Sequence, residues 1–143
     1  MAMLYWSVVE GYRATPLSVK LGIEETSTVA VLHAPVSFEL DLPAGVEVRR
    51  RTRGRADVVV ALFTHTSKLA REIDALGRMV VPSGARWIAW PKKVSTVVSD
   101  VTDHVVRDTA LPLGLVDNKV CAIDATWTGL RLVWRVSVGE ARE

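Results

Sequence analysis

Three hydrophobic patterns follow one another between residues 57 and 93, and they predict a strand, a helix and a second strand. Residues 57–63 form a nearly continuous apolar run, which is typical of a strand buried on both faces of a parallel sheet. Ser67 offers a helix-capping oxygen, and Pro82-Ser83-Gly84 ends the helical pattern. The apolar side of this helix recurs at helical spacing: Leu69, Ile73, Leu76 and Val80. Residues 85–90 supply the second strand.

The segment before this unit predicts a short helix and two strands. Thr15-Pro16-Leu17 begins the helix, with the threonine as cap and the proline at the first helical position, and Gly22 ends it. Residues 28–33 form a strong strand. Residues 38–42 suit one helical turn. Only alternate residues of 46–49 are apolar, so this weaker strand is expected near a sheet edge.

The segment after it predicts a helix and a hairpin. Ser99 or Asp100 caps the helix, whose apolar side comes from Val101, Val105 and Val106 and which Pro112 and Gly114 end. Residues 119–123 and 130–136 are strands, joined by a turn at Trp127-Thr128-Gly129. Two strands joined by so short a loop must be antiparallel.

Together these elements predict an α/β protein with a three-layer, Rossmann-like arrangement. The sheet is mostly parallel, with helices on both faces and a C-terminal antiparallel hairpin closing one edge. No linker divides the chain, so one domain over residues 1–143 is expected, with a possible arm at 1–12 and a frayed tail at 139–143. The arm and the edge hairpin are candidate surfaces for a homodimer.

Composition narrows the class of protein. The 143 residues are 49% hydrophobic and 24% charged, as in ordinary globular proteins. No apolar run approaches the length of a membrane span, and the amino terminus has no export leader. The single cysteine, Cys121, excludes an internal disulfide and fits a reducing compartment. We therefore expect a cytoplasmic protein without a membrane partner.

The positive charge is concentrated in residues 49–55, which hold five arginines and no acid. A nucleic-acid-binding domain usually has a broader basic face, so this distribution argues against nucleic acid as a partner. Two interpretations of the run stay open. It is either a solvated loop or strand face, or a clamp for a partner that carries phosphate or carboxylate groups.

The order of elements over residues 28–138 resembles the methyltransferase form of the Rossmann fold, especially its second half. A second resemblance, to the bacterial family called domain of unknown function 3052 (DUF3052), rests on short blocks along nearly the whole chain. The blocks are Gly11-Tyr12, Thr15-Pro16-Leu17, Lys20-Leu21-Gly22-Ile23, Ala34-Pro35, Trp90-Pro91-Lys92-Lys93, Gly114-Leu115-Val116-Asp117, Lys119-Val120-Cys121-Ala122-Ile123-Asp124 and Trp127-Thr128-Gly129-Leu130.

The chain departs from that family pattern at three places. His33 replaces the usual Asn before Ala-Pro, Arg13-Ala14 replaces Ser-Gly, and Thr96 replaces a Gly. These resemblances imply a fold more than an activity.

Ligands of open α/β sheets bind beyond the carboxyl ends of the strands, where the strand order reverses. If strands 28–33 and 57–63 are neighbours, His33-Ala34-Pro35 and Thr64-His65-Thr66 line that crevice, and Trp90-Pro91-Lys92-Lys93 borders it. Nucleotide cofactors need a glycine-rich turn after the first strand, and the turn here has no glycine. Arg49-Arg50-Arg51 stands where an acid would hold a ribose. No cofactor is therefore expected, neither S-adenosylmethionine nor NAD in its conventional mode.

Lys92 and Lys93, beside the flat face of Trp90, are candidates to bind an anionic or planar ligand, although exposed lysines are usually only solubilising. Ala34, Pro35 and Thr64 are further candidates to bind the ligand. Asp117 is expected to cap a turn, and Asp124 is expected either to cap a turn or to face the crevice. Trp127 is expected to be partly exposed like Trp90. Trp87 and Trp134 are expected in the core, Cys121 as a buried thiol, and His104 in water.

His33 and His65 are weak catalytic candidates, as an acid–base pair facing each other across adjacent strand ends. A metal site would need Asp117 or Asp124 as a third ligand, and no metal is expected. Three functions stay open. The first is a binding or regulatory module for a small anionic ligand or a protein partner. The second is an enzyme using His33, His65 and Lys92, and the third is a divergent S-adenosylmethionine-dependent methyltransferase.

Overall fold

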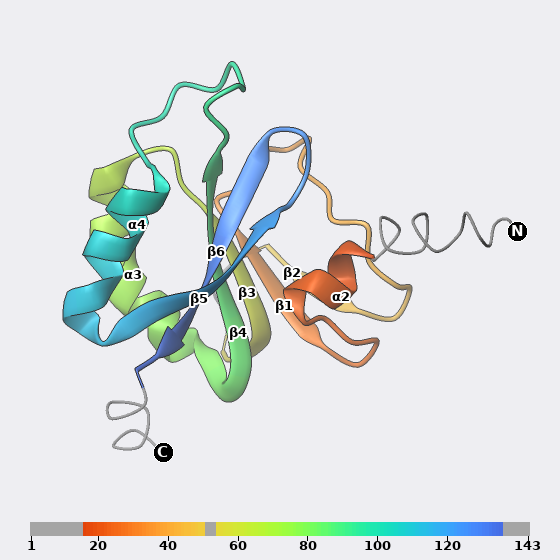
Figure 1. Ribbon diagram of the computed structural model, residues 1–143. Helices are drawn as coiled ribbons and strands as arrows, with labels where there is room; N and C mark the ends of the chain where they lie inside the picture. The colour runs from red at the N-terminus through yellow and green to blue at the C-terminus, as the bar shows by residue number, and fades with distance from the viewer. Residues whose placement is uncertain (1–15, 51–53, 136–143) are drawn as a thin grey trace, which may run out of the picture.

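The computed structural model describes residues 16–50 and 54–135, which contain a six-stranded mixed sheet (Figure 1). Its strand order is β2-β1-β3-β4-β6-β5. The strands are β1 (Thr28–Leu32), β2 (Glu47–Arg49), β3 (Ala56–Leu62), β4 (Val80–Pro91), β5 (Leu115–Ala122) and β6 (Trp127–Trp134). The strands β1 to β4 run parallel to one another, whereas β6 runs antiparallel to both of its neighbours, β4 and β5. The predicted edge strand and edge hairpin are thus confirmed.

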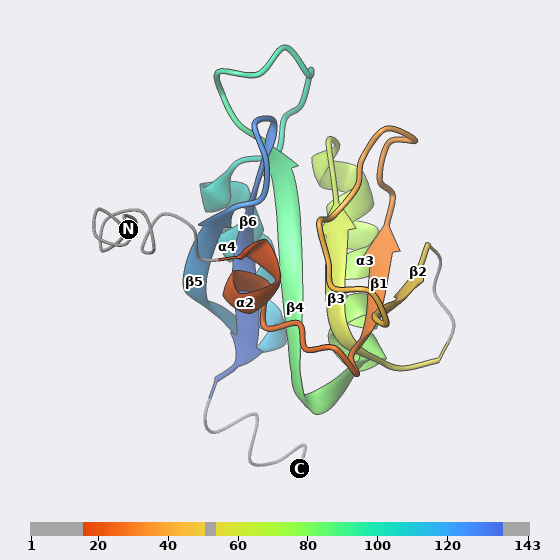
Figure 2. The same cartoon turned by 90° about the vertical axis from the view of Figure 1, so that its right-hand side faces the viewer.

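Helices cover both faces of the sheet. The helices α3 (Thr66–Met79) and α4 (Asp103–Ala110) lie on one face, and α2 (Leu17–Leu21) lies on the other (Figure 2). A 3-10 turn at Leu111–Leu113 follows α4. The predicted mostly parallel, three-layer Rossmann-like fold is confirmed. Within the described residues, no helix has the length and apolar character needed to cross a bilayer.

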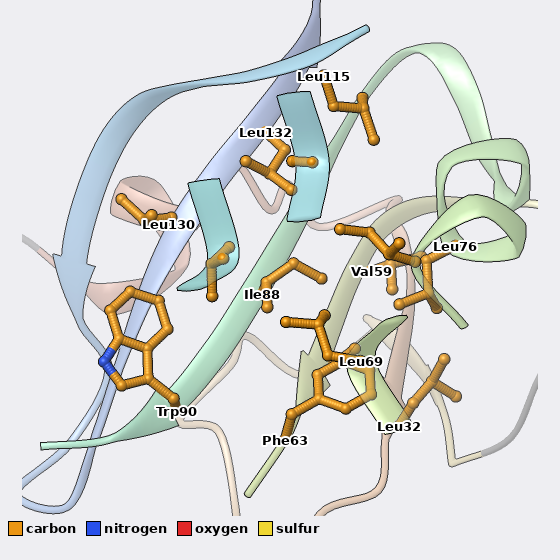
Figure 3. Packing of buried hydrophobic residues seen from close by; sticks show 14 of the residues in the cluster. Leu32, Val59, Phe63, Leu69, Leu76, Ile88, Trp90, Leu115, Leu130 and Leu132 are labelled. Atoms are coloured by element: carbon orange, nitrogen blue, oxygen red, sulfur yellow. The ribbon is translucent and has the colours of Figure 1, made fainter. Parts of the chain in front are cut away.

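The central strand β3 contributes side chains to a hydrophobic cluster on each face of the sheet. Val59, Ala61 and Phe63 lie in a cluster with the inner faces of α3 and α4 (Figure 3). Val58 and Val60, which point the other way, lie in a second cluster on the α2 side. Because successive side chains of a strand alternate between faces, a continuous apolar run is what two covered faces require.

The junction between α3 and β4 differs from the prediction. Pro82-Ser83-Gly84 does not end the helix, because β4 begins at Val80, directly after Met79. The pairing of β3 with β4 is irregular there: Ala56 pairs with Val80, but Val58 pairs with Ala85. Gly84 lies so close to Asp57 that a Cβ atom would overlap the Asp57 carbonyl oxygen. The sequence signal of a breaker therefore marks a close strand contact instead.

The predicted helix caps are largely wrong. Ser67 does not cap α3, whose first amide, that of Thr66, donates instead to the carboxylate of Asp100 at 2.8 Å. The cap of α4 is Thr102, which accepts a hydrogen bond from Val105, and not Ser99 or Asp100. A cap supplied from 34 residues away cannot be read from local sequence.

Smaller corrections concern the start of α2 and two loops. Pro16 is the residue before α2 and not its first helical residue, while Gly22 ends that helix with φ 82° as predicted. No helical turn forms over residues 38–42. The hairpin turn lies at 123–126, before Trp127-Thr128-Gly129, which belong to β6. Thr15, the arm at 1–12, the tail at 139–143 and residues 51–53 lie outside the described residues.

One charged side chain is buried in the core. Arg86 is 3% exposed and lies 5.3 Å from the ring centroid of Trp134, over which its guanidinium stacks. Its terminal nitrogens donate to the carbonyl oxygens of Leu132, at 3.2 Å, and Gly77, at 3.4 Å. Burial, with repulsion from Arg131, lowers the pKa of this guanidinium. Trp87 is fully buried and Trp134 partly so, in agreement with their predicted core positions.

The close approach at Gly84 predicts a large effect of one added carbon. Gly84→Ala should lower the free energy of unfolding by about 1–3 kcal/mol, because the new methyl group must displace backbone of β3. The matched control is Gly77→Ala in α3, where the added carbon meets Trp134 at an ordinary 3.4 Å. That change should be neutral or stabilising, because alanine favours a helix by about 1 kcal/mol over glycine. Urea denaturation of both variants measures the difference; equal stability would contradict it.

Candidate functional site

A crevice opens where the strand order reverses, between the carboxyl ends of β1 and β3. These strands are parallel neighbours, with Leu32 paired to Ala61, so their ends meet at one edge of the sheet. The cavity has a volume of about 500 Å³. Its polar lining residues are His33, Ser37, Thr64, His65, Lys68 and Thr126. Its apolar lining residues are Ala34, Pro35, Leu62, Phe63, Val97 and Trp127.

The wall that follows β1 is held in an unusual backbone conformation. His33 has φ 62°, in the left-handed region, where a residue other than glycine is disfavoured by about 1–2 kcal/mol. Its Nε2 lies 2.5 Å from the Oε1 of Glu72 on α3, and its ring packs against Phe63 with centroids 5.4 Å apart. Pro35 then accepts a hydrogen bond from the amide of Phe38. These contacts hold His33 at the crevice against its backbone preference.

The opposite wall is the turn from β3 into α3, which contributes Thr64, His65 and Lys68. Asp100 fastens this turn. Its carboxylate accepts hydrogen bonds from the amide and hydroxyl of Thr66, at 2.8 and 3.0 Å, and its amide donates to the carbonyl of Thr64. The Thr66 hydrogen bonds, the backbone one first, hold the pKa of Asp100 below its ordinary value. The segment after β4 is thereby attached to the crevice wall.

In the part of the chain that the structure describes, the ionisable side chains that line the crevice are those of His33, His65 and Lys68, and all three carry nitrogen. Glu72, which pairs with His33, is not itself a lining residue. The ammonium group of Lys68 has no carboxylate within 4 Å among the described residues. No carboxylate lines the cavity in that part of the chain. The arrangement therefore suits an anion, and the His33–Glu72 pair could also orient an imidazole for proton transfer.

The structure brings together five of the residues predicted for this site: His33, Ala34, Pro35, Thr64 and His65 all line the cavity. No hydrogen bond joins His33 to His65 in residues 16–50 and 54–135, where His33 pairs with Glu72 instead. Nor do the described residues contain a cluster of three or more groups able to hold a metal ion.

The predicted residues at the end of β4 do not lie in the cavity lining. Lys92 and Lys93 are outside it, and Trp90 is only 7% exposed, with its ring in the α3 and α4 core (Figure 3). The expectation that Trp90 and Trp127 are partly exposed was wrong, since Trp127 is 5% exposed. Trp127 does line the cavity. Side chains alternate along β4, and the position of Trp90 in that alternation directs its ring into the core.

Asp124 caps the hairpin turn, one of its two predicted roles: its carboxylate accepts from the amides of Thr126 and Trp127 at 2.8 and 2.7 Å. Asp117 does not cap a turn but pairs with Arg107 of α4 at 3.2 Å. Cys121 is buried, as predicted, and burial raises the pKa of its thiol. His104 is exposed, also as predicted.

Sequence reasoning missed Lys68 and Glu72, the two residues of α3 that serve the site. They are four positions apart and so lie on one side of the helix. A signal existed, because Lys68 stands in the first turn of a helix that starts at the predicted crevice. Ser37, Val97 and Thr126 were also missed. They come from loops whose course nothing in the local sequence determines.

The arginine run is only partly described. Arg49 pairs with Glu47 on the edge strand β2 at 2.7 Å, and Arg50 donates to the carbonyl oxygen of Phe38 at 3.1 Å. Both contacts lie on β2 and the adjoining loop, and neither arginine lines the crevice.

A smaller cavity of about 220 Å³ lies at the other end of the sheet, near the amino ends of β1 and β3. Its lining includes Arg131 but also the carboxylates of Glu24 and Asp57, and Asp57 already accepts a hydrogen bond from the amide of Thr28. The crevice is the larger of the two, and it is at the edge where ligands of open α/β sheets bind.

The chain does not fit a nucleotide cofactor bound in the usual way. Such a cofactor needs backbone amides and a helix N-terminus directly after the first strand. Here the connection from β1 to β2, residues 33–46, is fully described and contains no helix. Pro35 has no amide hydrogen to donate. The strand β2 ends at Arg49, and Arg50 follows it, so no carboxylate stands at the end of the strand to hold a ribose.

Solved structures similar to this chain share its fold. CalO1, a methyltransferase in calicheamicin biosynthesis solved with SAH bound, has a TM-score of 0.53 at 15% identity, over 92% of this chain and 57% of that chain. The PH0226 protein from Pyrococcus horikoshii OT3 also has a TM-score of 0.53, at 13% identity, over 92% and 91%. The B. subtilis tRNA methyltransferase TrmK has a TM-score of 0.51 at 7% identity, over 84% and 65%.

The chain therefore has the methyltransferase-like form of the Rossmann fold. It spans 57% of CalO1 and 65% of TrmK, so it is shorter than either methyltransferase. Identities of this order establish the fold alone. No protein-family model matches the chain, and no curated protein matches its sequence. The resemblance to DUF3052 is therefore not confirmed.

The attachment of Asp100 to α3 predicts a pH-dependent contribution to stability. Because folding lowers the pKa of this carboxyl, its contribution is complete above the unfolded-state pKa and is lost as the pH falls through the folded-state pKa. Asp100→Ala should be less stable than the wild type at neutral pH, and the difference should shrink in acid. Thermal unfolding at several pH values measures this.

The control for that experiment is Asp41→Ala. Asp41 is exposed on the 33–46 loop, and no hydrogen bond or ion pair joins it to the described chain. Its replacement should leave stability close to the wild-type value. A stability loss in Asp100→Ala that persists unchanged in acid would show that the helix cap does not depend on the carboxylate charge.

Proposed function

We propose that this protein binds a small anionic ligand in the crevice between β1 and β3. The observation that carries the proposal is Lys68, which lines the cavity together with His33 and His65 and whose ammonium group has no carboxylate partner in the described chain. A volume of about 500 Å³ is within the range of small-molecule sites, roughly 300–1,000 Å³. An anion entering here would supply the missing partner of the lysine.

The lining of the crevice favours an anion held by side chains. Thr64 and Ser37 add hydroxyl groups to the lining from opposite walls. His65 lies next to Thr66, whose amide is occupied by Asp100, so the N-terminus of α3 is already partly satisfied. The anion is therefore held by side chains more than by a helix terminus. This differs from the backbone-based binding of phosphate groups in Rossmann folds.

A second candidate function is S-adenosylmethionine-dependent methyl transfer. The observation that favours it is the fold, which resembles CalO1 and TrmK, both described as methyltransferases, at TM-scores of 0.53 and 0.51. The absence of a helix in the described 33–46 connection opposes conventional binding of the cofactor. Because one fold hosts many functions, we base the proposed function on the residues of the crevice and not on the similarity of fold to methyltransferases.

Binding of inorganic phosphate tests the proposal. In an NMR titration of ¹⁵N-labelled protein, the amide signals of Thr64, His65 and Lys68 should shift and saturate. Lys68→Gln should weaken phosphate binding at least about tenfold, because a hydrogen bond to a charged group contributes about 1.5–3 kcal/mol. The matched control is Lys93→Gln, since Lys93 is an exposed lysine outside the cavity lining.

The two lysines also distinguish the structural site from the sequence-based prediction. If Lys93→Gln weakens binding and Lys68→Gln does not, the anion site lies at the end of β4 and the proposal fails. Calorimetric titration with S-adenosylmethionine is run in parallel. Micromolar binding of that compound, unaffected by Lys68→Gln, would replace the proposed function with the second candidate.

A further inference from the structure

Exposed valines border the crevice on two loops that are far apart in sequence. Val36 lies in the loop after β1 and is 103% exposed, as much as in an extended peptide. Val97 and Val98 lie in the loop after β4 and are 40% and 90% exposed, and Val94 of the same loop is 88% exposed. Both loops lie at the end of the sheet where the parallel strands terminate (Figures 1 and 2).

Three of these valines, Val36, Val97 and Val98, either line the cavity or stand next to lining residues in the sequence. Val97 lines it, and Val36 stands between Pro35 and Ser37, which also line it. We call Val36, Val97 and Val98 the valine rim. Single exposed apolar residues on a protein surface need no explanation, whereas exposed apolar residues on several loops at one opening are typical of binding sites. The rim continues inward into the apolar part of the lining, which includes Phe63 and Trp127.

The loop that carries Val97 and Val98 is attached at both ends. The amide of Lys92 donates to the carbonyl oxygen of Thr126 at 2.7 Å, and Asp100 is bound to Thr66. The exposed valines are therefore not at a frayed end. They are presented beside the opening by hydrogen bonds to two crevice-forming segments, the hairpin turn and the start of α3.

We propose that the ligand of the crevice is an amphiphile, with one anionic group bound by Lys68 and an apolar body that covers the valine rim. This inference rests on the proposed function and adds the chemical class of the ligand. A simple inorganic anion would leave the rim in water, where each valine exposes apolar surface. Positive charge and apolar surface at one opening are complementary to a molecule that carries a negative head and an apolar body.

A series of straight-chain carboxylates provides the test, with acetate, butyrate, hexanoate and octanoate as probes. Burial of a methylene group contributes about 0.8 kcal/mol, so each added CH₂ should lower Kd by up to about fourfold. Octan-1-ol, which has the chain without the charge, should bind more weakly than octanoate. NMR titration of the full chain measures each Kd.

Variants separate the head from the body of the ligand. The double variant Val36→Ser/Val97→Ser should reduce the dependence of Kd on chain length. Lys68→Gln should raise the Kd of every carboxylate by a similar factor and leave the dependence of Kd on chain length intact. The control is Val120→Ser on the edge strand β5, where the valine is 64% exposed and remote from the cavity lining. Val120→Ser should change neither quantity.

Failure of this inference differs from failure of the proposed function. If phosphate and all the carboxylates bind with Lys68 dependence but Kd does not fall with chain length, the amphiphile is excluded and the anion site stands. If neither phosphate nor any carboxylate binds, the anion site itself is refuted. A chain-length dependence that survives Val36→Ser/Val97→Ser also overturns the inference, because the apolar body would then lie elsewhere.

Discussion

The burial of β3 on both faces is the constraint on which the rest of the structure depends. Val59 and Val60 have no solvent exposure, although their side chains point to opposite sides of the sheet. A strand of this kind must have a hydrogen-bonded neighbour on each side and a covering layer on each face. The parallel pairing of β3 with β1 and β4 follows, as do α3 on one face and α2 on the other. The crevice lies where β3 and β1 end together.

The crevice itself is held by a few contacts between distant segments. Glu72 of α3 pairs with His33, which follows β1, and Asp100 after β4 caps α3. Each contact joins two walls of the cavity, so the three loops around it depend on one another. Interactions of this type order the loops on a rigid sheet, which is a common way to build a binding site. The left-handed backbone of His33 is stable only in that context.

The likeness to solved methyltransferases is a likeness of fold, and the crevice has to be judged from its own residues. The fold is similar to those of the solved structures at identities of 7% to 15% and TM-scores of 0.51 to 0.53. Yet residues 33–46 contain no helix, and Pro35 follows β1 where a nucleotide fold would present amide donors. A site on a fold is made by particular side chains and loop conformations, and these change without disturbing the core. In this chain the crevice presents cationic and apolar side chains instead of backbone donors.

The sequence by itself determined the existence, type and order of the main elements, because hydrophobic periodicity follows from burial and survives any detail of packing. It also predicted which residues at the ends of β1 and β3 line the crevice, His33 to Pro35 and Thr64 to His65, because the carboxyl ends of parallel neighbours meet at one edge of a sheet. Only the tertiary structure decided the rest. The cap of α3 comes from Asp100, Trp90 turns into the core, and Lys68 replaces Lys92 and Lys93 in the cavity lining. These outcomes depend on contacts between segments that are distant in the sequence, and the local sequence does not specify such contacts.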